Sequence, residues 1–183
     1  AHARGRPDLG VAAGDGPPVS APGEALSASL AAGGLSWRVA GRFVDYVLGS
    51  GGRMTPSGGA EVDATGMPSW PLREDALDAA GRLRFAGEVR FDAHFGALDL
   101  GVADPELEVD GGVAVLRVRS TTAAGALALA RATWREFAPS GGFRVFLGES
   151  VELAAEAVPL FGGVYPAGLP LDPFVVALPV RIE

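Results

Sequence analysis

The sequence predicts a mainly β protein, either an antiparallel β-sandwich or a partly closed barrel, with one or two short helices. Three observations favour this fold class. Much of the chain consists of short apolar runs that are separated by turn residues. Glycine and proline are abundant, with 27 and 14 residues among 183, and they interrupt the runs at short intervals. The hydrophobic content is 48%, yet no apolar stretch reaches the roughly 18 residues of a membrane-spanning helix.

Residues 1–24 are rich in Ala, Gly, Pro and Asp and have little periodicity. Such a segment cannot bury enough apolar surface to offset the entropy lost on ordering, so we expect a flexible N-terminal leader. We expect residues 25–183 to form a single domain, because that length is sufficient for one hydrophobic core.

A helix is expected over residues 35–48. Its apolar stripe has helical spacing and consists of Val39, Phe43, Tyr46 and Val47. This stripe predicts that Tyr46 lies in the last turn, facing the core, with Arg42 beside it on the helix surface. Ser36 is expected to be the N-cap or a first-turn residue. The glycine-rich residues 49–52 end the helix.

Strand candidates follow a glycine-rich loop over residues 49–59. They lie at residues 60–64, 69–74, 82–93, 96–103, 105–109, 113–120, 126–134, 143–152 and 173–182. Turn residues separate most of them, as at Asp104-Pro105 and Ser140-Gly141-Gly142. Residues 153–161 have helical spacing despite Pro159, which predicts a second short helix.

Composition excludes several function classes. The chain has no Cys, so it has no disulfides, thiolate metal sites or Cys nucleophiles. A net charge of −7 argues against nucleic-acid binding, which needs a basic face. The chain contains no Gly-x-Ser-x-Gly elbow, Walker loop or zinc-ligand spacing. Acids such as Asp92, Asp99 and Glu106 are indistinguishable from surface acids. We therefore expect that the chain is not an enzyme.

Both tyrosines, and the one histidine beyond the leader, lie in three separated segments: residues 35–47, 91–100 and 161–173. A phenolate and an imidazole suit the first and second coordination spheres of ferric haem iron. Taken singly, Tyr46 and Tyr165 also fit core tyrosines whose hydroxyl groups reach water, and His94 fits a strand histidine bonded to a backbone carbonyl. The three tryptophans fit either core packing or a sugar-binding platform: Trp37, Trp70 and Trp134.

Together the three segments resemble the HtaA domain of corynebacterial and related actinobacterial haem-uptake proteins. The first motif of that domain, L-x-W-x-V-x-x-x-F-x-x-Y-V, is matched by Leu35, Trp37, Val39, Phe43, Tyr46 and Val47. The second motif is matched by His94, Leu98-Asp99-Leu100 and Asp104-Pro105. The third motif is matched by Ala157, Phe161, Gly162, Gly163, Tyr165, Gly168 and Leu171-Asp172-Pro173. The resemblance spans roughly residues 35–180, and its strength is the order of the three motifs.

The resemblance implies a module that binds ferric haem b and relays it during extracellular haem acquisition, in a secreted or cell-surface protein. It implies Tyr46 as the tyrosinate iron ligand, His94 as its hydrogen-bond partner and Tyr165 as a residue of the haem pocket. The implied partners are haemoglobin or other haem-binding proteins and a haem transporter. We expect no nucleic-acid partner and no membrane-spanning segment in this chain. The alternative is a cell-surface β-sandwich interaction module that binds a glycan or a protein partner.

Further haem-pocket residues are expected from their places around these motifs. They are Ser36, Trp37, Arg42, Phe43, Arg53, Met54, Phe95 and Phe161. The apolar members would line the porphyrin, and the cationic or hydroxyl members would face its propionates. Phe95 departs from the small residue that commonly follows the histidine in this domain, and we expect it to narrow the pocket near His94.

Overall fold

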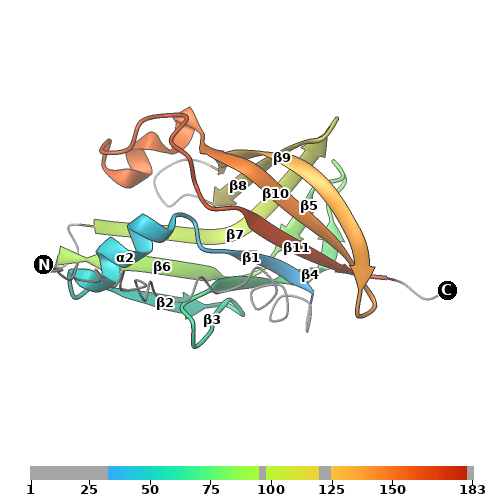
Figure 1. Cartoon of the computed structure of the whole chain (residues 1–183), viewed down its shortest axis with the longest axis horizontal. Coiled ribbons are helices and arrows are strands. Elements are labelled where there is room, and N and C mark those ends of the chain that lie inside the picture. Colours follow the sequence, from blue (N-terminus) through green and yellow to red (C-terminus); the bar gives the residue numbers. More distant parts are fainter. Residues whose placement is uncertain (1–32, 95–97, 120–124, 181–183) are drawn as a thin grey trace, which may run out of the picture.

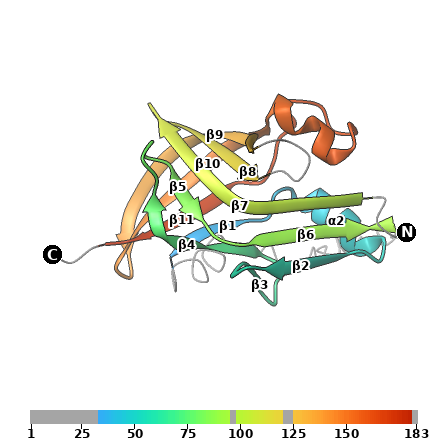
Figure 2. The same ribbon diagram turned by 180° about the vertical axis from the view of Figure 1, so that it is seen from behind.

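A closed antiparallel barrel of eight strands forms the centre of the fold in the computed structural model of the chain (Figures 1 and 2). The structure describes residues 33–94, 98–119 and 125–180. The ring runs β7-β5-β4-β1-β11-β10-β9-β8, and pairing of β8 with β7 closes it. The predicted mainly β class is confirmed, and of the two predicted architectures the barrel is the one formed. The expected leader and Phe95 lie outside the described residues.

The ring strands are β1 (Gly34–Trp37), β4 (Pro68–Leu77), β5 (Leu83–Phe85), β7 (Leu98–Asp110), β8 (Val113–Arg119), β9 (Ala126–Ser140), β10 (Phe143–Leu153) and β11 (Phe174–Pro179). The strands outside the ring are β2 (Arg53–Ser57), β3 (Glu61–Val62) and β6 (Glu88–Ala93). β6 extends the sheet from β7, β2 pairs with β6, and β3 pairs with β4. The helices in the described residues are α2 (Gly41–Gly49) and the 3₁₀ helix η2 (Ala155–Phe161). Neither is long and apolar enough to cross a membrane.

Most strand predictions are confirmed to within a few residues, but three are wrong. Residues 53–57, predicted as loop, form β2. The predicted strand 82–93 is two strands, because the chain turns at Gly87, which has a φ of 98°. Asp104-Pro105 is not a turn: β7 continues through it, and the extra residue is absorbed as a bulge where Asp104 has a φ of 41°.

The helix prediction is correct in its second half only. Ser36 lies in β1 rather than at the start of a helix. Val39 has a φ of 65°, a left-handed backbone that ends the extended segment, and α2 then begins at Gly41. The buried residues of α2 are Phe43, Val44 and Val47. The apolar stripe is therefore completed by Val44, so Tyr46 is 51% exposed instead of facing the core.

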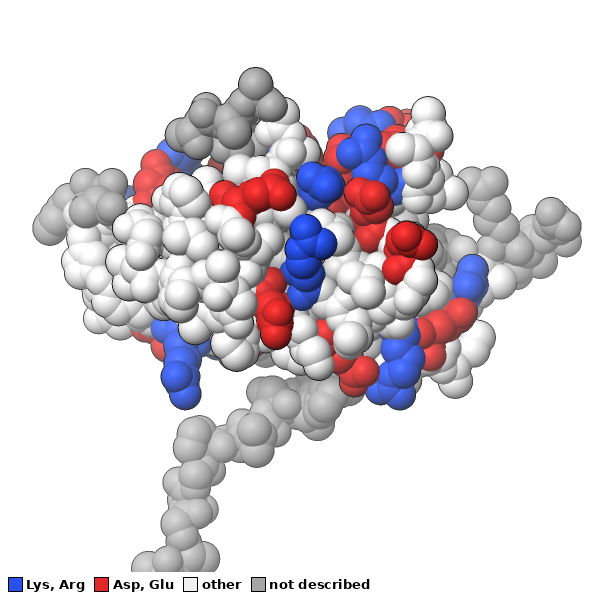
Figure 3. All heavy atoms as spheres, turned by 90° about the horizontal axis from the view of Figure 1, so that it is seen from above, with Lys and Arg blue, Asp and Glu red and all other residues white. Residues whose placement is uncertain are grey.

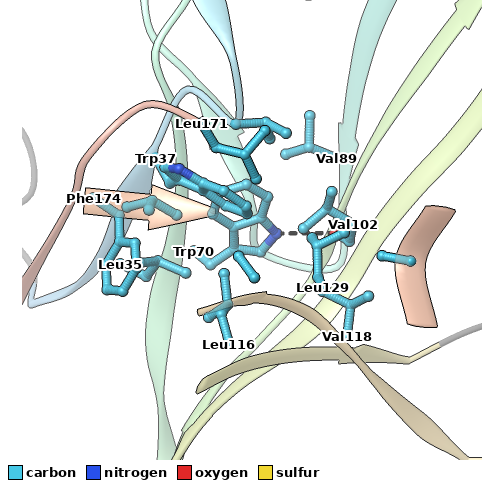
Figure 4. Close-up of a cluster of buried hydrophobic side chains, with 14 of the residues drawn as sticks. Leu35, Trp37, Trp70, Val89, Val102, Leu116, Val118, Leu129, Leu171 and Phe174 are labelled. Carbon is cyan, nitrogen blue, oxygen red and sulfur yellow. Dashed lines mark hydrogen bonds between the residues drawn. The ribbon is translucent and has the colours of Figure 1, made fainter. Parts of the chain in front are cut away.

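Two tryptophans fill the middle of the barrel (Figure 4). Trp37 and Trp70 are fully buried. The indole N–H of Trp70 donates to the carbonyl oxygen of Val102 at 3.2 Å, and the ring of Trp37 meets that of Phe174 edge-on at 6.1 Å. Since neither tryptophan exposes any surface, a sugar-binding platform built from them is wrong, and the core interpretation is confirmed.

Candidate functional site

Tyr46 and His94 meet where the last turn of α2 lies beside the end of β6. The phenol oxygen of Tyr46 is 2.7 Å from Nε2 of His94, a hydrogen-bond distance. The two ring centroids are 5.5 Å apart, with the planes tilted by 49°. Both side chains are exposed. The pair therefore offers a phenol oxygen that a ligand can reach, with an imidazole bonded to it.

A tight turn after α2 brings these two side chains together. Gly52 N–H donates to the carbonyl oxygen of Val47 at 2.9 Å. A Cβ on Gly52 would lie 2.3 Å from the carbonyl oxygen of Asp92, so only glycine allows the turn to pass this close to β6. β2 then pairs with β6, which fixes the end of β6 against the end of α2. His94 follows with a φ of 53°, a strained backbone for a residue other than glycine.

Phe43 connects all three sequence segments that carry the motifs. From the middle of the buried face of α2, its ring contacts Phe91 of the second segment at 5.4 Å. It also contacts Phe161 and Tyr165 of the third segment, at 5.4 and 6.5 Å. The ring of Tyr165 packs edge-on against that of Phe161 at 5.6 Å. This aromatic cluster holds α2 between β6 and the segment that includes η2.

A cavity of about 420 Å³ lies between the first turn of α2 and the segment that follows β10. Its lining is mostly apolar and includes Phe43 and Phe161. Its polar members are Arg42, Tyr165 and Asp172. The structure thus brings four of the predicted pocket residues to one cavity: Arg42, Phe43, Phe161 and Tyr165.

Asp172 is a residue of this region whose role the sequence did not reveal. Its carboxylate Oδ2 accepts a hydrogen bond from the backbone N–H of Gly41, the first residue of α2, at 2.9 Å. Its carbonyl oxygen accepts the indole N–H of Trp37 at 2.8 Å, and its own N–H donates to the carbonyl oxygen of Val39 at 2.9 Å. The residue at the N-cap of α2 is Ala40, whose side chain has no hydrogen-bond acceptor, so a cap had to come from elsewhere in the chain. That was the one feature of the sequence that pointed to a distant capping residue.

The other predicted pocket residues lie elsewhere. Ser36 and Trp37 are 3% and 0% exposed in β1, so they present no surface to a ligand, and neither lines the cavity. Arg53 is exposed on β2 and forms an ion pair with Asp92 at 3.3 Å. Met54 is half-buried on the same strand and packs against the core.

Comparison with known proteins places this arrangement in a family. The sequence model of the HtaA family matches residues 32–177. The chain is similar in structure to the C-terminal domain of HtaA from Corynebacterium glutamicum, with 23% identity, a TM-score of 0.64, and coverage of 78% of this chain and 94% of that one. The N-terminal domain of the same HtaA has 21% identity and a TM-score of 0.61, covering 82% and 97%. The haem-binding protein HtaB from that organism has 21% identity and a TM-score of 0.59, covering 80% and 92%.

These structural likenesses concern the fold, because the identities are low. No curated protein matches the chain. The family match, in contrast, covers most of the residues and includes all three motif segments. The chain therefore belongs to the HtaA family.

Proposed function

We propose that this chain binds ferric haem b with Tyr46 as a tyrosinate iron ligand, and that His94 is hydrogen-bonded to that ligand. The observation that carries the proposal is the 2.7 Å contact between the phenol oxygen of Tyr46 and Nε2 of His94, on exposed side chains. Membership of the HtaA family supports it, as does the likeness to HtaB, which is a haem-binding protein.

The donor set fits haem better than a bare metal ion. Among the described residues, no three side chains of the His, Cys, Asp or Glu type gather into a metal-binding group. A porphyrin brings its own ring of nitrogen donors, so one protein ligand suffices to hold its iron. Tyr46 supplies a hard oxygen, which suits ferric iron.

His94 has a defined role in this site. A free phenol ionises only at about pH 10, so at neutral pH a proton competes with the iron for the phenol oxygen. An N–H of His94 that donates to the oxygen favours the ionised form and fixes the orientation of the ring. The hard anionic oxygen of Tyr46 would hold ferric iron more tightly than ferrous iron, which suits a site that must also release its ligand.

We further propose that the chain is a carrier, not an enzyme, and that it works in a secreted or cell-surface protein. A single exposed tyrosinate ligand suits uptake and release of haem. Its partners would then be proteins that give up or accept haem, such as haemoglobin, other haem-binding proteins or a haem transporter. The net charge of −7 is consistent with partners other than nucleic acid.

Titration with hemin tests the proposal. The wild-type chain should give a Soret band together with a tyrosinate-to-iron charge-transfer band. Tyr46→Phe keeps the aromatic ring but removes the ligand oxygen, so the charge-transfer band should disappear. Tyr165→Phe is the matched control, because it removes the only other tyrosine hydroxyl, and the band should remain. An unchanged spectrum of Tyr46→Phe would show that Tyr46 is not the ligand.

A further inference from the structure

The segment after β10 contains the longest stretch of the sequence without a charged residue. Residues 157–171 read AVPLFGGVYPAGLPL, and Tyr165 has the only polar side chain among these fifteen residues. We call residues 157–171 the uncharged lobe. Eight of its residues are exposed: Pro159, Gly162, Gly163, Val164, Pro166, Ala167, Gly168 and Pro170.

The rest of the described surface is rich in paired charges. Ten of the twelve arginines in the described ranges lie within ion-pair distance of a carboxylate. Figure 3 looks from above Figure 1, so that η2 faces the reader, and a broad area on its left has no charged side chains. Within the lobe, Val164 is 76% exposed, the highest value among the exposed large hydrophobic side chains of the described ranges. Such a surface favours contact with another apolar surface.

The lobe is held in a fixed shape by the rest of the fold. The N–H of Gly168 donates to the carbonyl oxygen of Leu153 at 2.9 Å, which fastens the lobe to the end of β10. The rings of Phe161 and Tyr165 pack on that of Phe43, at 5.4 and 6.5 Å. Three prolines further restrict the backbone of the lobe. A surface that is already ordered loses little conformational entropy when a partner docks on it.

The lobe lies at the same end of the barrel as the candidate site. Figures 1 and 2 both show η2 and the chain after it at the end that carries α2. The contact of Phe43 with Phe161 joins the lobe to the middle of α2, and Tyr46 is three residues after Phe43 on that helix. A partner on the lobe would therefore stand beside the pair of Tyr46 and His94.

The chemistry of the lobe decides what kind of partner fits it. A charged partner surface would have to lose water there without gaining an ion pair. An anionic lipid surface would repel a chain of net charge −7, and the lobe has no Trp, Lys or Arg to anchor it in a membrane. A second copy of this chain fits best. Two copies repel each other wherever their charged faces meet, and at the lobe they can approach with no charges opposed.

The size of the lobe sets the strength of such a contact. The same apolar surface on two copies is complementary to itself about a two-fold axis. Its exposed residues are few and mostly Gly, Ala and Pro, so the area buried would fall below the roughly 1,200 Å² at which stable complexes begin. A contact of this size is transient, and it forms and dissociates with concentration.

We propose that the uncharged lobe is a self-association surface on which a second copy of this chain docks transiently, lobe against lobe. The association itself requires no haem. One consequence rests on the proposed function: the contact brings two Tyr46–His94 pairs to neighbouring positions, so haem can pass from a loaded copy to an empty one within the complex.

Sedimentation equilibrium of the haem-free chain tests the association. The average mass should rise above the 18.6 kDa of one chain as the concentration increases, and it should return to that value on dilution. Association should strengthen between about 20 and about 200 mM NaCl, because salt screens the repulsion between two negative chains. A contact built on ion pairs would weaken over the same range.

Val164→Arg should weaken the association at least about tenfold, because it places an unpaired charge in the contact. The loss cannot come from the net charge, which this variant makes less negative. Leu77→Arg is the matched control: it makes the same change of charge on a side chain that is 64% exposed at the end of β4, outside the lobe. It should associate at least as well as the wild type. An equimolar mixture of Val164→Arg and Val164→Glu should recover much of the association, since opposite charges then meet across the contact.

Hemin transfer between copies tests the consequence. The chain has no Lys, so an amine-reactive dye labels a haem-free copy at its N-terminus only, and arriving haem quenches the dye. The transfer rate should rise in proportion to the concentration of the labelled copy, and Val164→Arg in both copies should remove this dependence. A rate independent of that concentration in the wild type would overturn transfer within the complex.

The two proposals fail separately. A wild-type mass that stays at 18.6 kDa, a dimer that persists on dilution, or an association that Val164→Arg leaves unchanged would overturn the self-association surface, whether or not the chain binds haem. Absence of the charge-transfer band in the hemin titration would overturn the proposed function and leave the self-association standing.

Discussion

The carboxylate of Asp172 accepts a hydrogen bond from the N–H of Gly41, 131 positions earlier in the chain, and so caps α2 from the far end of the sequence. Two more hydrogen bonds of Asp172, with Trp37 and Val39, fasten the same junction. The third motif therefore holds the helix that carries Tyr46. The Asp172 position of that motif is therefore explained by its hydrogen bonds within the fold and does not require contact with a ligand.

Asp172→Ala should lower the free energy of unfolding by about 1–2 kcal/mol, as the loss of a helix cap does. The N–H of Gly41 would lose its partner at a junction that is only partly open to water. Thermal unfolding followed by circular dichroism measures the change. Asp172→Asn keeps an acceptor and should recover most of the loss. Glu74→Ala, on the exposed part of β4, is the control and should leave the midpoint unchanged.

Gly52→Ala should move Tyr46 and His94 apart without changing either side chain. The new Cβ would lie 2.3 and 2.7 Å from the backbone oxygens of Asp92 and Val47, which cannot rotate away. The turn must shift, and we expect a loss of about 2 kcal/mol in stability together with weaker hemin binding.

Gly49→Ala provides the matched control for that change. A Cβ on Gly49 would meet no other atom within 4 Å, and the residue lies in the helix, where alanine is favoured. The stability of this variant should be equal to or up to about 1 kcal/mol above that of the wild type. Similar behaviour of the two variants in denaturant unfolding would contradict the steric argument.

His94→Ala should weaken hemin binding. Without the imidazole, the phenol oxygen of Tyr46 loses its hydrogen-bond partner at 2.7 Å, so hemin affinity should fall about tenfold and the charge-transfer band should shift. His2→Ala, which changes the only other histidine, should leave both unchanged. An unchanged band position in His94→Ala would exclude the proposed hydrogen bond in the haem complex.

The Arg90–Asp99 ion pair should contribute a small, pH-dependent part of the stability. The hydrogen bond from Arg90, with its charge, holds the pKa of Asp99 below its usual value. This contribution is present above the unfolded-state pKa of about 3.9 and is lost as the pH falls through the lower folded-state value. Because the pair is exposed, Asp99→Asn should cost less than about 1 kcal/mol at neutral pH. Urea titrations should give equal stabilities for variant and wild type once the pH is well below about 3.9.

Local patterns predicted much of the sheet, because alternation and turn residues act over a few positions. They failed at Leu35 to Trp37, where the spacing to Phe43 and Val47 suggested a continuous helix. The reversal of the backbone at Val39 separates the two elements, and no property of a valine side chain signals a positive φ.

The sequence indicated which residue types could form the candidate site, but not how those residues lie relative to one another. Tyr46 and His94 are 48 positions apart, and no local period relates them; the resemblance to a family suggested their pairing, and the fold brings them together. Asp172 belongs to the third motif, but its role as a helix cap was not predictable, because its partner is a backbone N–H, which every residue except proline has.

The placement of β6 and α2 outside the barrel ring has a consequence for exchange of the ligand. Tyr46 and His94 stand on these two appended elements, so the pair can part by a small outward movement that breaks no hydrogen bond between ring strands. Such an opening requires less free energy than global unfolding. The barrel can therefore keep its shape while Tyr46 and His94 move apart, so a ligand held between α2 and β6 could leave or enter without unfolding of the barrel.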